Sequence, residues 1–248
     1  MTALSTSARR LRVGIVDSGC DADERDRLQV IAGQCFVDSD AGDIAMAPLQ
    51  ADRLGHGTDL TRLIVAGYPA IDLLVAQVFV ARRDCSTAVA AAAIDWLVSC
   101  EAAVINLSFG VRHPDARLRL ACERAVAAGC ILVSSSPARG APSFPAAYPC
   151  CIAVCGDARC SAQQISWLGT RSADFGAHAP APGNPANGGA SYAAARVSAQ
   201  VARLLGHGTP ASAIRERLRA QCRYHGPERR QYRAAHNDGA PAPHAQRP

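Results

Sequence analysis

The chain has 248 residues, 49% of them hydrophobic and 5% aromatic, so it is long enough to bury one sizeable core. Its formal net charge of +5 comes from arginine alone, because the sequence contains no lysine. The arginines lie dispersed along predicted helices without interleaved aromatic residues, and no apolar run reaches the roughly 18 residues of a membrane span. We therefore expect neither nucleic acid nor a membrane as a partner.

An apolar strand followed by an acid comes first along the chain. Residues 11–16 predict a buried strand of a parallel sheet, and Asp17 follows directly, ahead of a turn at 18–19. Catalytic and ligand groups in open α/β sheets collect at the carboxyl ends of strands. Asp17 is therefore a candidate site residue.

A histidine between two glycines comes next. His56 lies between Gly55 and Gly57, ahead of a helical pattern that places apolar residues on one face. The spacing predicts that the imidazole lies at a helix start, where flanking glycines let other backbone approach closely.

The middle of the chain alternates apolar runs with helical patterns. We expect strands at 73–80, 104–107 and 131–133 and helices at 86–100 and 115–129. The second helix is expected to bury a stripe made of Leu118, Cys122, Ala125 and Val126. Strands that alternate with such helices predict an α/β fold with a parallel sheet and helices on both faces.

A serine opens the last strong helical pattern. Ser191 follows the sequence NGGA, and the pattern continues to a predicted C-cap at Gly206. A serine there has its own backbone N–H and the positive helix end available to a developing oxyanion. Residues 210–224 predict one more helix.

Each of the three candidates has a simpler alternative: a turn residue for Asp17, a surface histidine for His56 and an N-cap for Ser191. Their order and neighbours favour the functional interpretation. They resemble the subtilisin-like (S8) serine peptidases, whose triad follows the order Asp, His, Ser. Three further blocks carry the same resemblance, at 103–110, 144–154 and 174–180. The resemblance implies a subtilisin-like three-layer α/β/α fold with a mainly parallel central sheet.

The resemblance also implies roles for particular residues. Ser191 would be the nucleophile, His56 the general base and acid, and Asp17 the group that orients the imidazole. An extended peptide substrate would pair with one strand edge and place its side chain in an adjoining pocket. The candidate substrate-binding residues are Ser108, Phe109, Gly110, Ser134, Ser135 and Ser136. No cofactor is implied.

One part of the family pattern is missing. Subtilisin-like enzymes supply an asparagine amide to the oxyanion hole just after the strand expected here at 131–133, but no asparagine occurs between Leu107 and Gly183. Losing this donor costs about 10²–10³ in turnover, which predicts a slow enzyme. The Ser191 N–H would remain, and the side-chain donor stays open among Ser135, Ser136, Asn184 and Asn187.

Eleven cysteines form an odd set that does not predict a disulfide framework. The dense group at 150–155 lacks the paired spacing of a zinc site, so we expect buried thiols and no metal. Cys20, three residues after Asp17, is expected to make the chain sensitive to thiol reagents.

The domain organisation is simple. We expect a short N-terminal segment at 1–11, a peptidase domain at 12–225 and a disordered tail rich in Pro, Ala and Arg at 226–248. Residues 1–12 lack the apolar region of a signal peptide and leave no room for a propeptide, which predicts a cytoplasmic protein.

A slow and selective cytoplasmic peptidase suits the removal of a leader from a precursor peptide. In this the chain resembles compact intracellular subtilisin-like proteins that process modified peptides, such as those of quinohemoprotein amine dehydrogenase maturation. The expected partner is a peptide or protein substrate, in the narrowest case a single dedicated precursor. The alternative is a catalytically impaired subtilisin-fold module that binds peptide without turnover.

Overall fold

The protein is built around one large sheet. The structure, a computed structural model, describes residues 10–39 and 42–228, without the side chains of residues 185–187. Ten strands form the sheet in the order β12-β8-β9-β7-β6-β5-β1-β4-β2-β3. In chain order they are β1 (Leu11–Asp17), β2 (Val30–Asp38), β3 (Ile44–Pro48), β4 (Ile71–Gln77), β5 (Val104–Leu107), β6 (Ile131–Ser135), β7 (Cys151–Gly156), β8 (Ile165–Trp167), β9 (Phe175–Ala177) and β12 (Tyr224–His225). A separate two-stranded sheet joins β10 (Pro180–Ala181) to β11 (Asn184–Gly188).

The middle of the large sheet is parallel. The strands from β9 through β7, β6, β5, β1 and β4 to β2 pair in parallel, and antiparallel pairs occur at β8–β9 and β2–β3. Asp17, at the end of β1, lies beside Gln77 of β4. The carboxyl ends of the central strands therefore meet at one edge, where the candidate site lies.

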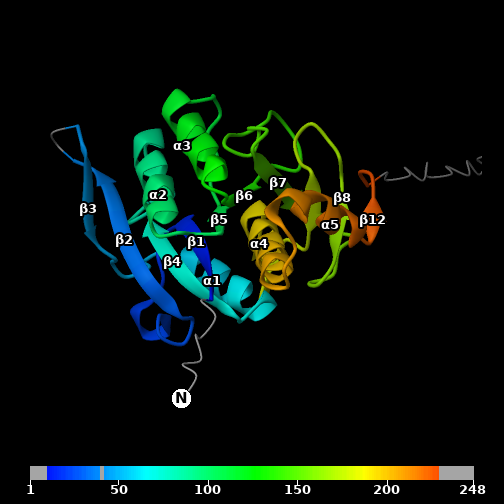
Figure 1. Cartoon of the computed structure of the whole chain (residues 1–248), viewed down its shortest axis with the longest axis horizontal. Helices are drawn as coiled ribbons and strands as arrows, with labels where there is room; N and C mark the ends of the chain where they lie inside the picture. The colour runs from blue at the N-terminus through cyan, green and yellow to red at the C-terminus, as the bar shows by residue number, and fades with distance from the viewer. Residues whose placement is uncertain (1–9, 40–41, 229–248) are drawn as a thin grey trace, which may run out of the picture.

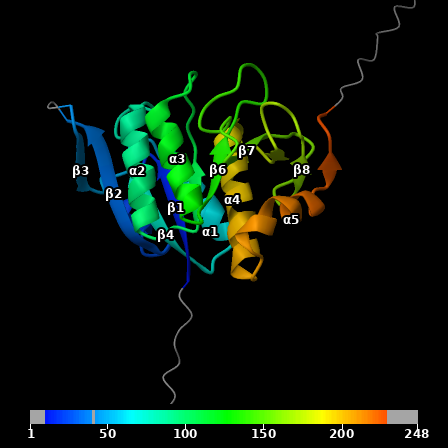
Figure 2. The same ribbon diagram turned by 45° about the horizontal axis from the view of Figure 1, so that its top comes forward.

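Helices cover both faces of this sheet (Figures 1 and 2). Alternate strand residues point to opposite faces. Val13 and Ile15 of β1 belong to the buried cluster that includes α1 (His56–Gly67) and α4 (Ala190–Gly206), whereas Val16 belongs to the cluster that includes α2 (Thr87–Ser99) and α3 (Ala116–Ala127). The result is the three-layer α/β/α arrangement with a mainly parallel central sheet that was expected from the sequence. The helices are α1 (His56–Gly67), α2 (Thr87–Ser99), α3 (Ala116–Ala127), α4 (Ala190–Gly206) and α5 (Ile214–Ala220), with short 3₁₀ turns η1 (Ala22–Glu24) and η2 (Ala211–Ala213).

The predicted boundaries need some correction. The expected strand at 73–80 is β4 at Ile71–Gln77, because β1 ends at Asp17, whose carbonyl accepts from the N–H of both Val78 and Phe79, and the pairing with β2 also ends at Gln77. The expected helix at 210–224 is wrong at its end, because Tyr224 pairs with Ser166 in β12.

Two predicted residue roles are also wrong. Val126 was expected on the buried face of α3, but its side chain is 39% exposed. Ala121 is buried on that face in its place. Gly206 is the last residue of α4 and not its cap. The turn that ends the helix places Gly208 at φ 84°, with the Thr209 N–H donating to the Leu204 carbonyl, as in a Schellman motif.

The ends of the chain lie mostly outside the described residues. The expected N-terminal segment is described only at residues 10–11, and the expected disordered tail only at residues 226–228. Within the described part of the chain, no helix has the length and apolar character needed to cross a membrane.

Candidate active site

Asp17 and His56 form the centre of the candidate site. The Nδ1 atom of His56 lies 2.7 Å from Oδ1 of Asp17, across 39 positions of sequence. Asp17 is fully buried and His56 is 6% exposed. The same carboxylate oxygen accepts a hydrogen bond from the Ser18 backbone N–H at 2.7 Å. The imidazole therefore has one ring nitrogen committed to the acid and the other left for a reaction partner.

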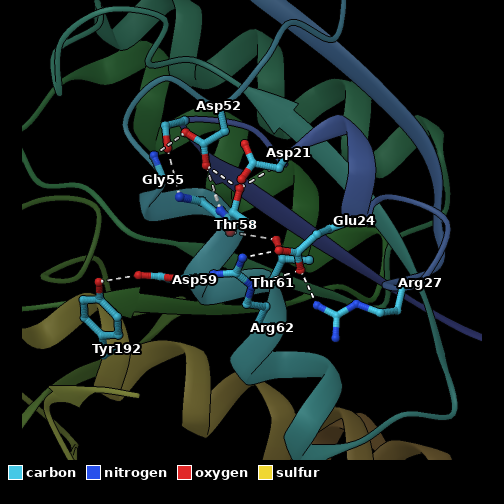
Figure 3. A network of polar contacts seen from close by, with 12 residues as sticks. Asp21, Glu24, Arg27, Asp52, Gly55, Thr58, Asp59, Thr61, Arg62 and Tyr192 are labelled. Carbon is cyan, nitrogen blue, oxygen red and sulfur yellow. Dashed lines mark hydrogen bonds and ion pairs between the residues drawn. The ribbon is translucent and has the colours of Figure 1, made fainter. Parts of the chain in front are cut away.

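The start of α1 fixes the position of His56. Gly55, the N-cap, has φ 67°, a left-handed conformation that favours glycine. Asp52 supplies the capping group that Gly55 lacks, since its carboxylate accepts from the backbone N–H of Gly55 and of Thr58, both at 2.9 Å (Figure 3). Burial raises the pKa of Asp52, but the hydrogen bonds from Thr58, Ser18 and Gly55 together outweigh it and hold this pKa below its usual range. Sequence reasoning missed Asp52, four residues before His56.

The turn after Asp17 touches the helix that carries His56. The Gly57 N–H donates to the Ser18 hydroxyl oxygen at 2.9 Å. A Cβ at Gly57 would lie 2.3 Å from the Gly19 carbonyl oxygen, closer than any side chain can approach. Glycine at position 57 therefore allows the contact between the segments that carry the acid and the imidazole.

Ser191 meets His56 at a pocket. It is the second residue of α4 and is half-buried. As a first-turn residue it carries one of the N–H groups that a helix leaves without an internal partner. The pocket has a volume of about 220 Å³ and is lined by His56, Phe79, Arg83, Asp84, Cys85, Ser108, Phe109, Gly110, Val111 and Ser191. The structure thus brings together the three substrate-binding candidates at 108–110 with two of the three catalytic candidates.

A family model described as the subtilase family (peptidase S8) matches residues 8–221 of this sequence. The chain belongs to the subtilase family. Subtilisin amylosacchariticus from Bacillus subtilis subsp. amylosacchariticus is 28% identical over 242 residues, which cover 87% of this chain and 61% of that protein. An intracellular serine protease from Paenibacillus polymyxa is 27% identical over 145 residues, covering 54% and 44%. A thermostable alkaline protease from Halalkalibacterium halodurans is 30% identical over 154 residues, covering 58% and 40%.

This subtilase spans about half the length of the curated relatives it matches. Solved structures show the same fold. A lanthipeptide protease superposes with a TM-score of 0.64 at 19% identity, covering 83% of this chain and 78% of that one. A cold-adapted subtilisin-like serine proteinase superposes with a TM-score of 0.63 at 19% identity, covering 85% and 81%.

Asn106 of this subtilase has a structural place. Its Nδ2 donates to the Ser108 hydroxyl oxygen at 2.8 Å, and its Oδ1 accepts from the Ser198 hydroxyl at 2.9 Å. All three side chains are nearly or fully buried. Asn106 therefore ties the end of β5 to α4, and its amide is already engaged at both ends.

The remaining candidates, which are the four possible oxyanion donors and the substrate-binding candidate Ser134, lie in different surroundings. The Ser136 hydroxyl donates to the Ser172 carbonyl at 2.5 Å, and Ser134 is fully buried with no partner among the described residues for its hydroxyl. Neither these two nor Ser135, which is 8% exposed, lies in the lining of the pocket with Ser191. Asn184 is exposed in β11, and the side chain of Asn187 lies outside the described residues.

The cysteines are all free thiols. The expectation for Cys20 is unsupported by its surroundings, because this residue is fully buried and burial raises the pKa of its thiol to about 11. Cys85, and not Cys20, lines the pocket that contains Ser191. Burial raises the pKa of the Cys85 thiol to about 12, which disfavours its reactive thiolate form. Among the described residues, no group of three or more His, Cys, Asp or Glu side chains is arranged to hold a metal ion.

Tyr192 is a further residue of the site that the sequence did not single out. Its ring lies at right angles to the His56 imidazole, with centroids 5.7 Å apart and an interplanar angle of 88°. Its hydroxyl donates to Asp59 Oδ2 at 3.2 Å (Figure 3). In the sequence, only its position next to Ser191 indicates that Tyr192 could belong to the site.

Proposed function

We propose that the chain is a serine endopeptidase of the subtilisin type, with Asp17, His56 and Ser191 as its catalytic residues. The observation that carries the proposal is the 2.7 Å contact between Asp17 and the Nδ1 of His56, on an imidazole that lines one pocket with Ser191. A buried acid bonded to an imidazole, and a hydroxyl in the same pocket as that imidazole, are the groups that acyl transfer requires.

The mechanism follows from these positions. His56 Nε2 takes the hydroxyl proton as Ser191 Oγ attacks the substrate carbonyl, and returns it to the leaving amine, so that an acyl-enzyme remains. Water then attacks the ester by the same route and frees Ser191. Asp17 holds the Nδ1 proton in place and stabilises the imidazolium while both steps occur.

Stabilisation of the oxyanion limits the rate. The Ser191 N–H supplies one donor at the positive end of α4. Ser108 supplies the second in this proposal, because it lines the pocket and its oxygen already accepts from Asn106, which leaves the hydroxyl hydrogen to donate. A hydroxyl in place of an amide gives a slow enzyme.

Substrate selection is assigned to the same pocket. The substrate backbone pairs with residues 108–110 by strand addition. Phe79 and Phe109, whose rings meet edge to face with centroids 6.5 Å apart, give the pocket an aromatic wall with Val111 nearby. A bulky apolar side chain next to the scissile bond fits this lining.

A leader or precursor peptide is the proposed substrate, in the narrowest case one dedicated precursor. The slow site and the small pocket support this role, because both restrict the cleavage of other proteins. One solved structure with the same fold is a lanthipeptide protease. We place the enzyme in the cytoplasm, supported by the similarity to an intracellular serine protease.

Labelling with a fluorophosphonate tests the proposal. We expect the probe to modify the wild-type chain, Ser191→Ala to abolish the label, and the exposed control Ser161→Ala to keep it. Mass spectrometry of the labelled peptide locates the adduct. A folded wild-type chain without label would defeat the proposal. If the folded wild-type chain took no label, and Ser191→Ala and the wild type bound precursor peptide equally tightly, the chain would be the peptide-binding module instead.

A further inference from the structure

The helices α1 and α4 carry His56 and Ser191, and a hydrogen bond between two side chains joins these helices close to both residues. His56 is the first residue of α1, and Ser191 lies in the first turn of α4. Asp59, one turn along α1 from His56, accepts the hydroxyl hydrogen bond of Tyr192, the neighbour of Ser191. The bond spans 133 positions of sequence and links the starts of the two helices.

The Asp59 carboxylate is itself held on its other side. Its Oδ1 accepts from Arg62 at 2.9 Å, and Arg62 also bonds to both carboxylate oxygens of Glu24 in η1 (Figure 3). Oδ2 is thereby presented to Tyr192. Burial and the Asp59 charge raise the pKa of Tyr192, so its hydroxyl stays protonated and remains a donor.

The Tyr192 ring restrains the orientation of the His56 imidazole in addition to the hydrogen bond to Asp17. The ring is attached through Cβ and hydrogen-bonded at Nδ1, so the freedom that remains to it is rotation about the Cβ–Cγ bond, which one hydrogen bond limits only in part. Tyr192 is 3% exposed and meets His56 at right angles, an arrangement that aromatic rings favour. We infer that Tyr192, held by Asp59, is a positioning residue that keeps the His56 imidazole directed at Ser191. The inference rests on the proposed function, because it concerns the same proton transfer.

The inference assigns Tyr192 no contact with substrate. Its loss is therefore expected to slow the reaction of bound substrate and to leave substrate affinity unchanged. A purely structural tie between the helices would show the opposite result, with a loss of stability and no specific loss of rate.

The chain contains a matched control at the other end of the same helices. Tyr68, the C-cap of α1, meets the ring of His207, the C-cap of α4, at 82° with centroids 5.9 Å apart. This is a second edge-to-face contact of tyrosine with histidine between α1 and α4, and neither residue lines the pocket with Ser191. Tyr68→Phe therefore repeats the chemical change without touching the candidate site.

The experiment measures the fluorophosphonate reaction over a range of probe concentrations, which separates the limiting labelling rate from the probe affinity. Tyr192→Phe and Asp59→Ala are each expected to lower the limiting rate about 3- to 10-fold, the effect of one lost hydrogen bond, with affinity unchanged. The double variant is expected to be no slower than either single one, because both remove the same bond. Asp59→Asn keeps an acceptor oxygen and is expected to recover most of the rate.

Three results separate the possibilities. Limiting rates within about twofold of wild type in Tyr192→Phe and Asp59→Ala would overturn the inference while leaving the proposed function intact. Losses that appear equally in Tyr68→Phe, with a matching fall in melting temperature, would show a structural tie and overturn it as well. A wild-type chain that takes no label would defeat the proposed function and the inference with it. If Tyr192→Phe does not fold, Asp59→Ala against Asp59→Asn gives the same decision.

Discussion

At the scale of single residues, Ser108 illustrates how the site differs from the family pattern. The sequence marks it only as a substrate-binding residue, beside an oxyanion hole that lacks its asparagine. In the structure Ser108 is 8% exposed, lines the pocket and has its oxygen fixed by Asn106. Besides Ser191, it is the one hydroxyl-bearing residue in the described lining of that pocket.

Ser108→Ala is expected to lower the turnover number about 10²-fold, with little change in KM, because the donor acts on the oxyanion and not on the bound substrate. Steady-state kinetics on a peptide substrate measures both constants. Ser135→Ala is the comparison, since that hydroxyl lies outside the pocket lining. A large loss in Ser135→Ala with none in Ser108→Ala would assign the donor to Ser135.

The residues that the sequence could not predict are those whose partners lie far away. The family resemblance offered Ser136 as a pocket residue, but its hydroxyl donates to the Ser172 carbonyl, 36 positions later. Tyr192 fits the helical pattern and gives no hint of Asp59. By contrast, Asp17, His56 and Ser191 each stand at the junction of a strand or loop with a turn or helix, where a local pattern is informative.

At the scale of elements, the sequence predicts those that a continuous apolar pattern defines. The strand at 104–107 was predicted at its observed bounds, because its four residues are all buried. The strands β8, β9 and β12 contain only three, three and two residues, so pairing with neighbours defines them and no local period does. The end of α4 was misplaced because two glycines follow closely on each other and the sequence does not show which one takes the left-handed conformation. It is Gly208 and not Gly206.

The tie between β5 and α4 gives a stability prediction. Asn106→Ala removes the partner of two buried hydroxyls, Ser108 and Ser198, and leaves a cavity. We expect the free energy of unfolding to fall by about 2–4 kcal/mol, the cost of unsatisfied buried groups and lost packing. Urea unfolding followed by circular dichroism measures it. Ser198→Ala removes only one bond and is expected to cost about half as much; an equal or larger cost would contradict the assignment.

At the scale of the whole molecule, we expect carboxylates with lowered pKa values to contribute to the response of stability to acid. Hydrogen bonds from Arg62 lower the pKa of Glu24 from 4.5 to about 2. A capping bond from the Leu118 N–H lowers that of Asp115, and hydrogen bonds lower that of Asp52 against the opposing effect of burial. Asp21 acts in the opposite direction, since burial raises its pKa.

A carboxylate whose pKa is lower in the folded state stabilises the protein fully above its unfolded-state pKa. That contribution is lost as the pH falls through the folded-state pKa. For Glu24 the window runs from 4.5 down to about 2. We therefore expect the urea midpoint to be constant between about pH 6 and 7 and to fall steadily below about pH 4.5. Glu24→Gln is expected to lessen this fall. If the urea midpoint of the variant fell as steeply with pH as that of the wild type, Glu24 would not contribute to the acid response.

The contact between Gly57 and Gly19 has a consequence for how this chain can vary. A Cβ at position 57 would meet main-chain atoms of Gly19, which cannot rotate away as a side chain can, so all nineteen other amino acids meet the same obstacle. In a random library selected for activity, position 57 should thus return glycine alone. Gly55 and Gly189, whose Cβ positions are open but whose φ values are 67° and 154°, should admit some replacements at the cost of backbone strain. The spacing between acid and imidazole is thus encoded by the absence of a side chain.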